Sequence, residues 1–279
     1  MNTSNSPLTH QIEYKARQKA RRYSLIDTYE QATIALEKER QHTAKNKGYA
    51  YSPLKNALGW TARKIGLDGK VTQLPPYMNK IFTACRELID NPYRFRTLCL
   101  WGGVGIYRRD TRKNLAKVMV VLLARCDLTD GRIGVPSKDG MDTISHHELM
   151  NDYVLRWGEM IEESKWHRYV KFLSNAGFIT TLPINISIND ETGQGSEIRA
   201  IAAYKQLSTA FFTELRVSHF PNVATEIYQN RLKAENNGYR FDWIPFRMLA
   251  NRLVTCLNAT LFNENTTHVR SSPPVLSPH

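Results

Sequence analysis

The sequence predicts a mainly α-helical protein of the α+β class, in which a winged helix-turn-helix domain carries additional N-terminal and C-terminal helices. Three neighbouring segments predict this fold. A short helix is expected after Ser145, and an amphipathic helix follows over residues 164–176. Two β-rich runs, at residues 183–188 and 197–204, then flank a polar, glycine-containing tip. A helix pair closed by a hairpin is the order of a winged helix.

The amphipathic helix is expected to be the DNA-recognition helix. Ser164 is suited to cap it, because its hydroxyl can accept from a free backbone N–H, and Gly177 is suited to end it, because glycine enters the left-handed region without a Cβ penalty. Apolar residues at helical spacing form one face that would be buried: Trp166, Tyr169, Val170 and Leu173. The other faces keep donors suited to phosphates and base edges: Lys165, His167, Arg168, Lys171 and Asn175.

On duplex DNA, three of these side chains are expected to enter the major groove: Lys165, Arg168 and Lys171. Arg168 is the best candidate for a bidentate contact with guanine. Ser164 would offer the helix N-terminus to a phosphate. The alternative is an ordinary solvated surface helix, but the helix before it and the hairpin after it favour the DNA-binding interpretation.

The charge of the chain indicates the kind of partner, and its cysteines indicate the compartment. The chain of 279 residues has 38 Lys and Arg against 26 Asp and Glu, a formal charge of +12 that favours binding to a polyanion. No segment approaches the roughly 18 apolar residues of a membrane span, and the N-terminus shows no export signal. The four cysteines are widely spaced and are read as small buried hydrophobes of a reduced cytoplasmic protein: Cys85, Cys99, Cys126 and Cys256.

The N-terminal part is expected to be a disordered stretch, residues 1–10, followed by a helical region over residues 11–100. This region includes helices at residues 54–65 and 77–89. A basic cluster near its start is a candidate arm for the phosphate backbone: Lys15, Arg17, Lys19, Arg21 and Arg22. Two interpretations stay open for the region, a second DNA-binding domain or a dimerisation arm.

Residues 108–218 are expected to form the winged-helix domain. A core helix over residues 110–125 opens with basic residues, of which Arg112 and Lys113 are candidate DNA contacts. Residues 132–135 are expected to form a short strand that pairs with the wing, and residues 137–142 a polar loop. Helices are then predicted at residues 210–217, 222–235 and 242–261, the last two within a C-terminal helical region at 219–262. A disordered tail is expected at residues 263–279.

The sequence does not predict an enzyme, and no cofactor or metal ion is expected. The His146-His147-Glu148 triplet lacks the second histidine of a zinc-binding HExxH motif. The glycines at residues 102–105 lack the spacing of a phosphate-binding loop and are expected to form a flexible connection. His146 and His147 are expected in the first turn of the supporting helix, where they would approach a phosphate.

Two stretches resemble the RepA-type plasmid replication initiators of the IncFII group. The first is RYVKFLSNAGFIT at residues 168–180, and the second is LSTAFFTELRVS at residues 207–218. The resemblance spans about residues 110–218. It implies a protein that binds origin DNA without chemistry of its own and contacts host replication initiation and helicase-loading proteins. The chain departs from that family in its C-terminal region, which has an apolar helix instead of a long basic one.

Two other functions fit the same sequence pattern. A transcription regulator would share the winged helix and would bind at a promoter. A protein-interaction module would use the winged unit to form a homodimer and would bind nucleic acid without sequence preference. Origin binding is the preferred function, and these two stay open as alternatives.

Overall fold

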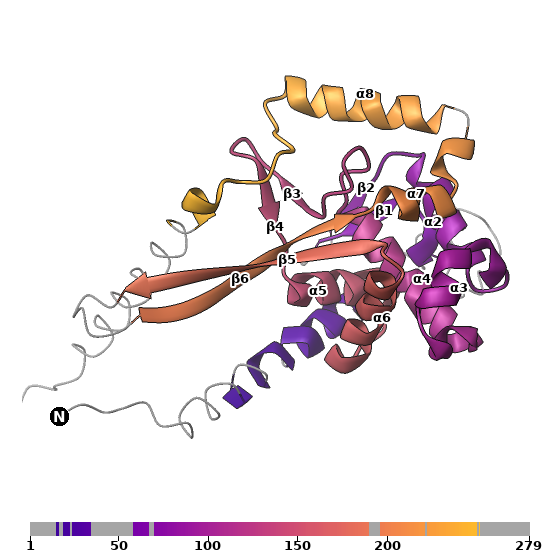
Figure 1. Ribbon diagram of the computed structural model, residues 1–279, viewed down its shortest axis with the longest axis horizontal. Helices are drawn as coiled ribbons and strands as arrows, with labels where there is room; N and C mark the ends of the chain where they lie inside the picture. The colour runs from indigo at the N-terminus through magenta and orange to yellow at the C-terminus, as the bar shows by residue number, and fades with distance from the viewer. Residues whose placement is uncertain are drawn as a thin grey trace, which may run out of the picture.

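The computed structural model describes residues 15–16, 19–22, 24–34, 58–66, 70–189, 196–220, 222–249 and 251 (Figure 1). These residues form a mainly helical body with three separate two-stranded antiparallel sheets, which agrees with the predicted α+β class. The predicted disordered ends, at residues 1–10 and 263–279, lie outside the described residues.

The helical residues 15–16, 19–22 and 24–34, called the N-terminal helix below, precede the labelled elements. The later helices are α2 (Met78–Glu87), α3 (Arg96–Trp101), α4 (Arg109–Ala124), α5 (His146–Trp157), α6 (Glu163–Asn175), α7 (Thr209–Glu214) and α8 (Val223–Asn236). Short 3-10 turns lie between them: η1 (Leu58–Trp60), η2 (Pro92–Arg94), η3 (Val104–Tyr107) and η4 (Val217–His219). The sheets pair β1 (Arg63–Ile65) with β2 (Val71–Gln73), β3 (Gly134–Pro136) with β4 (Met141–Thr143), and β5 (Ile179–Asn189) with β6 (Ser196–Leu207).

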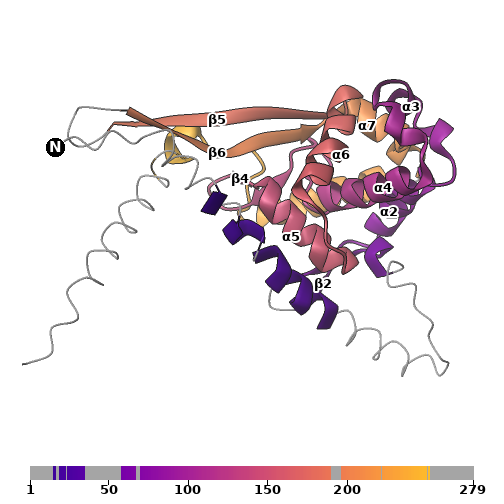
Figure 2. The same cartoon turned by 90° about the horizontal axis from the view of Figure 1, so that it is seen from below.

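Helix α4 is the centre of the core. Every residue from 115 to 123 is buried, because α2, α5 and α6 all pack against this helix (Figure 2). A surface helix would bury only one stripe of its side chains. The α4 segment is therefore the scaffold that holds α5 and α6 in place.

Local capping signals define α5 and α6, with one exception. Ser145 caps α5 as predicted, in a capping box with Glu148, and Gly177 has the left-handed φ of 69° expected after α6. The prediction that Ser164 caps α6 is wrong. The N-cap is Glu162, and the helix already includes Glu163, so Ser164 lies inside the first turn.

The β5–β6 hairpin follows α6 directly and extends away from the helical body (Figures 1 and 2). Its strands contain the two predicted β-rich runs, and the tip at residues 190–195 lies outside the described residues. The register shifts between Leu182 and Ile184, around Pro183. A proline has no N–H to donate to the ladder, which accounts for the irregularity there.

Two predicted segments near the helical core differ in the structure. Residues 63–65, expected to end a helix, form strand β1 and pair with β2. The guanidinium of Arg156 binds the carbonyls of Gly59, Thr61 and Arg63, so it holds both the chain before β1 and the first residue of the strand. Residues 137–142, expected to be a loop, contribute to the β3–β4 hairpin. The predicted link between residues 132–135 and the long hairpin is present only at its start, where Arg132 forms a bridge with Gln206 and the Ile133 N–H donates to the Lys205 carbonyl at 2.8 Å. Gly134 and Val135 belong to β3 and pair with β4 instead.

The C-terminal helix begins later than predicted. Residues 242–244 are not helical, because Trp243 forms a β-bridge with Met141, whose N–H donates to the Asp242 carbonyl at 2.7 Å. The Trp243 ring packs against Tyr204, with centroids 4.9 Å apart. Described helical residues start at Phe246. Helices α7 and α8 match the segments predicted for them within a few residues.

Candidate nucleic-acid interface

The orientation of α6 is set by contacts on its buried face. Trp166, Tyr169, Val170 and Leu173 are all buried, as the helical spacing predicts. The Trp166 Nε1–H donates to Nδ1 of His146 at 3.1 Å, and the Asn114 amide donates to the Tyr169 hydroxyl at 3.3 Å. These contacts decide which side chains of α6 face solvent.

Four candidate residues form one exposed row on α6, which we call the outer row: Ser164, Arg168, Lys171 and Asn175. At 100° per residue, their spacing of i, i+4, i+7 and i+11 places them opposite the buried face. The Arg168 guanidinium lies 5.7 Å from the Tyr169 ring centroid. Among the described residues, neither Arg168 nor Lys171 has an ion pair, so both cations face solvent uncompensated.

Lys165 and His167 lie on the flanks of α6 and have acidic neighbours. The Lys165 Nζ is 3.3 Å from Glu162, and the His167 Nε2 is 3.6 Å from Glu163. These two glutamates stand at the N-terminus of α6, where their charge complements the helix dipole and would repel a phosphate. The sequence does not distinguish among the polar donors of α6. The structure separates the outer row from Lys165 and His167, which have acidic neighbours.

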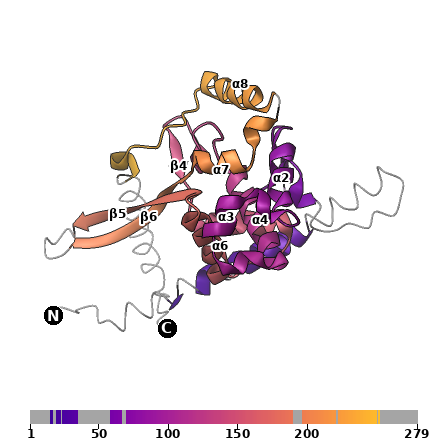
Figure 3. The same ribbon diagram turned by 45° about the vertical axis from the view of Figure 1, so that its right-hand side comes forward.

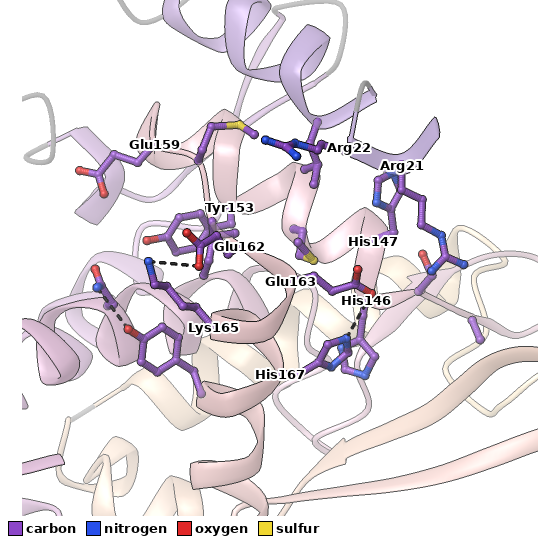
Figure 4. Close-up of a pocket in the computed structure, with 18 of the residues that line it drawn as sticks. Arg21, Arg22, His146, His147, Tyr153, Glu159, Glu162, Glu163, Lys165 and His167 are labelled. Atoms are coloured by element: carbon purple, nitrogen blue, oxygen red, sulfur yellow. Dashed lines mark hydrogen bonds and ion pairs between the residues drawn. The ribbon is translucent and has the colours of Figure 1, made fainter. Parts of the chain in front are cut away.

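A hollow of about 1360 Å³ lies between the N-terminal helix, α5, the start of α6 and strand β6. Cations of the N-terminal helix line one wall: Lys15, Lys19, Arg21 and Arg22. Lys165 and His167 of α6 face them across the hollow (Figure 4). The structure thus brings the predicted basic arm beside the predicted recognition helix, while Arg17 lies outside the described residues.

The N-terminal helix is held in this position by a small apolar face. Leu25, Thr28 and Ala32 are buried, and the Thr28 Oγ1 lies 3.5 Å from Oδ1 of Asn151 on α5. Lys15, Arg21 and Arg22 are exposed. The helix therefore buries one side against the body and directs a basic side toward the hollow and solvent.

The two adjacent histidines of α5 have different surroundings. Burial, with smaller effects from Lys205 and His167, lowers the pKa of His146 to about 3, so its ring is neutral and can accept from Trp166. His146 therefore positions α6 and is not placed as a phosphate ligand. His147 lines the hollow, where burial and the nearby Arg21 also lower its pKa.

Arg112, predicted together with Lys113 as a DNA contact, is bound to the body of the protein. The Arg112 guanidinium donates to the carbonyls of Ile89 at 2.9 Å and Tyr107 at 2.5 Å. The guanidinium thus links Ile89, which follows α2, to Tyr107 of η3. Lys113 is half-buried one turn from Lys117. Neither residue lies on the exposed row of α6.

Four buried cations among the described residues were not anticipated from the sequence: Arg63, Lys117, Arg156 and Lys205. Lys117 pairs with Glu159 at 2.5 Å, and Lys205 donates to the Ile144 carbonyl at 2.6 Å. Burial lowers the pKa of Lys205 to about 8. The apolar run around Lys117 was a signal of its burial, but the partners of Arg156 and Lys205 are distant in sequence and leave no local signal.

No protein-family model, curated protein or solved structure matches this chain. The resemblance to RepA-type initiators therefore stays a prediction from the residues that suggest it. In the described part of the chain, no helix has the length and apolar composition of a membrane span, and no group of three or more His, Cys, Asp or Glu side chains is arranged to hold a metal ion.

Proposed function

We propose that this chain is a sequence-specific duplex DNA-binding protein in which α4, α5, α6 and the β5–β6 hairpin act as a winged helix. The observation that carries the proposal is the outer row of α6, which presents Arg168 and Lys171 without ion pairs among the described residues, directly before a projecting hairpin. A helix can enter the major groove, where the donors of such a row reach base edges. The hairpin would then lie along the neighbouring backbone.

The roles within this interface follow from chemistry and position. Arg168, in the middle of the row, is the candidate for a bidentate guanine contact, and Asn175 offers an amide for a base edge or phosphate. Lys15, Arg21 and Arg22 would bind the phosphate backbone beside the start of α6. Lys165 and His167 must leave Glu162 and Glu163 before they can contact DNA, so their net contribution to the binding free energy is smaller.

We also propose that the target is a plasmid replication origin. The support is the resemblance of residues 168–180 and 207–218 to RepA-type initiators. In this function the protein marks the origin without catalysis. Host replication initiation and helicase-loading proteins are then the expected partners.

The test is a salt titration of binding to two duplexes, one from the origin region of the chain's own replicon and one of random sequence. A preference above about 10³ at physiological salt would support direct readout of the origin. Equal affinities that fall together with salt would overturn sequence-specific binding, because only backbone contacts behave in that way. A promoter fragment from the same replicon serves as the control that separates origin binding from transcription regulation.

A further inference from the structure

The segment around α3 and η3 exposes large apolar side chains to solvent. We call this surface the α3–η3 patch, and its exposed fractions are 82% for Tyr93, 65% for Leu100, 65% for Trp101, 88% for Val104 and 61% for Tyr107. Single exposed apolar residues are ordinary on protein surfaces. Five within fifteen residues of sequence, three of them aromatic, indicate a surface that contacts something.

The segments that carry the patch are joined by hydrogen bonds, so the patch is one surface. The Tyr107 hydroxyl donates to the Cys99 carbonyl at 3.5 Å, which holds η3 against α3. The Cys99 thiol donates to the Pro92 carbonyl at 3.1 Å, which holds the segment of Tyr93 there too. Stacking surfaces held in place lose little entropy when a ligand binds.

The patch adjoins α6 (Figure 3). Helix α3 packs against α6, and the glycine turn after α3 lies over the Phe172 ring. Gly103 has a φ of 113°, and a Cβ there would stand 3.3 Å from that ring, so the turn needs glycine. Phe172 is a neighbour of Arg168 on the helix surface, so the patch is continuous with the flank of the outer row.

Cations are interleaved with the rings. Arg96 lies one turn before Leu100 on α3, and Arg108 follows Tyr107 directly; both are exposed, and among the described residues neither has an ion pair. Arg109 differs, because it pairs with Asp90 at 2.9 Å. Arg96 and Arg108 thus place free positive charge beside the rings, which complements a polyanion, while Asp110, exposed two residues after Arg108, is an acidic neighbour in the first turn of α4.

We propose that the α3–η3 patch binds single-stranded DNA, with bases stacked on Trp101 and Tyr107 and phosphates bound by Arg96 and Arg108. Exposed rings between free arginines are what single-strand binding requires, since each unpaired base offers a π-face and each linkage a negative charge. A duplex hides its base faces, so it does not use the rings. Single-strand binding goes beyond the proposed function; only its role beside an opened origin depends on that function.

The test measures the affinity of the full chain for labelled oligo(dT) of about 20 nucleotides and for the origin duplex, by fluorescence anisotropy. Trp101→Ala and Tyr107→Ala should each weaken oligo(dT) binding about 5- to 100-fold and leave duplex affinity unchanged. Tyr228→Ala is the matched control, because Tyr228 is 59% exposed on α8, outside the patch. It should leave both affinities unchanged.

Arg168→Ala separates this proposal from the duplex-binding one. It should weaken duplex binding and leave oligo(dT) binding unchanged, the reverse of Trp101→Ala.

Wild-type oligo(dT) affinity in Trp101→Ala and Tyr107→Ala, or no oligo(dT) binding by the wild type, would overturn the single-strand site. A wild-type dimer in sedimentation that becomes a monomer in Trp101→Ala, with oligo(dT) affinity unchanged, would assign the patch to self-association instead. If Trp101→Ala loses its helical circular dichroism, Arg108→Glu supplies the same test with the rings intact.

Discussion

Trp166 of α6 donates its indole N–H to the neutral ring of His146 in α5, at 3.1 Å. This bond joins the first turns of two helices that are consecutive in the chain and sets the rotation of α6 about its axis. Because His146 must stay neutral to accept from the indole, the position of the outer row depends on its protonation state. The consequence is a link between pH and the stability of the interface.

Stability should fall as the pH is lowered from about 6.5 to 5. The folded protein keeps His146 neutral down to a pKa of about 3, whereas an unfolded histidine takes up a proton near 6.5. The unfolded state therefore binds more protons in this window, and the free energy of unfolding should drop by about 1.5 kcal/mol between pH 6.5 and 5. Urea titrations at several pH values measure this drop.

His146→Gln retains an acceptor for Trp166 but cannot titrate. The slope between pH 6.5 and 5 should therefore become shallower in this variant, with a remainder from His147, whose pKa burial also lowers. His219→Gln, at an exposed position, is the control. An unchanged slope in His146→Gln would show that another group is responsible.

Arg168→Ala should cost about 1–3 kcal/mol in binding to the specific duplex and should relax preference at one base pair, because a bidentate guanine contact is lost. Binding to a panel of single-base variants of the site measures both effects. Lys165→Ala is the comparison on the same helix, and its effect should be smaller because Lys165 gives up Glu162 to bind DNA. Equal weakening of all sequences by Arg168→Ala would contradict base readout.

Replacing Lys15 and Arg22 with alanine should weaken specific and random duplexes by the same factor. Both side chains are exposed beside the hollow and are expected to contact only phosphate. The slope of log affinity against log salt should become shallower by about one for each cation removed. A selective loss on the specific duplex would mean that the N-terminal helix reads bases.

Arg156→Gln should lower the free energy of unfolding by about 2–4 kcal/mol, because it leaves buried carbonyls of residues 59–63 without their charged donor. Thermal unfolding followed by circular dichroism measures this loss. Arg240→Gln is the control, since Arg240 is exposed. A similar small effect in both variants would mean that water replaces the guanidinium at no cost.

Sequence reasoning succeeded where the signal was local. Ser145 and Gly177 act at the ends of α5 and α6, so their roles can be recognised from the neighbouring residues alone. It failed at residues 63–65, where strand β1 depends on β2 and on Arg156, which is far along the chain. The N-cap of α6 was misplaced by two residues, because Glu162 also adopts the extended backbone of a cap.

By itself, the sequence determined the helical class, the buried face of α6 and the hairpin after it, because periodicity and capping act over a few residues. Only the tertiary structure decided which cations are available to a ligand. Arg112, Lys117 and Lys205 are bound inside the body, whereas Arg168 and Lys171 face solvent. Their side chains have similar chemistry, and what distinguishes them is the distant carbonyl or carboxylate that folding places beside each one.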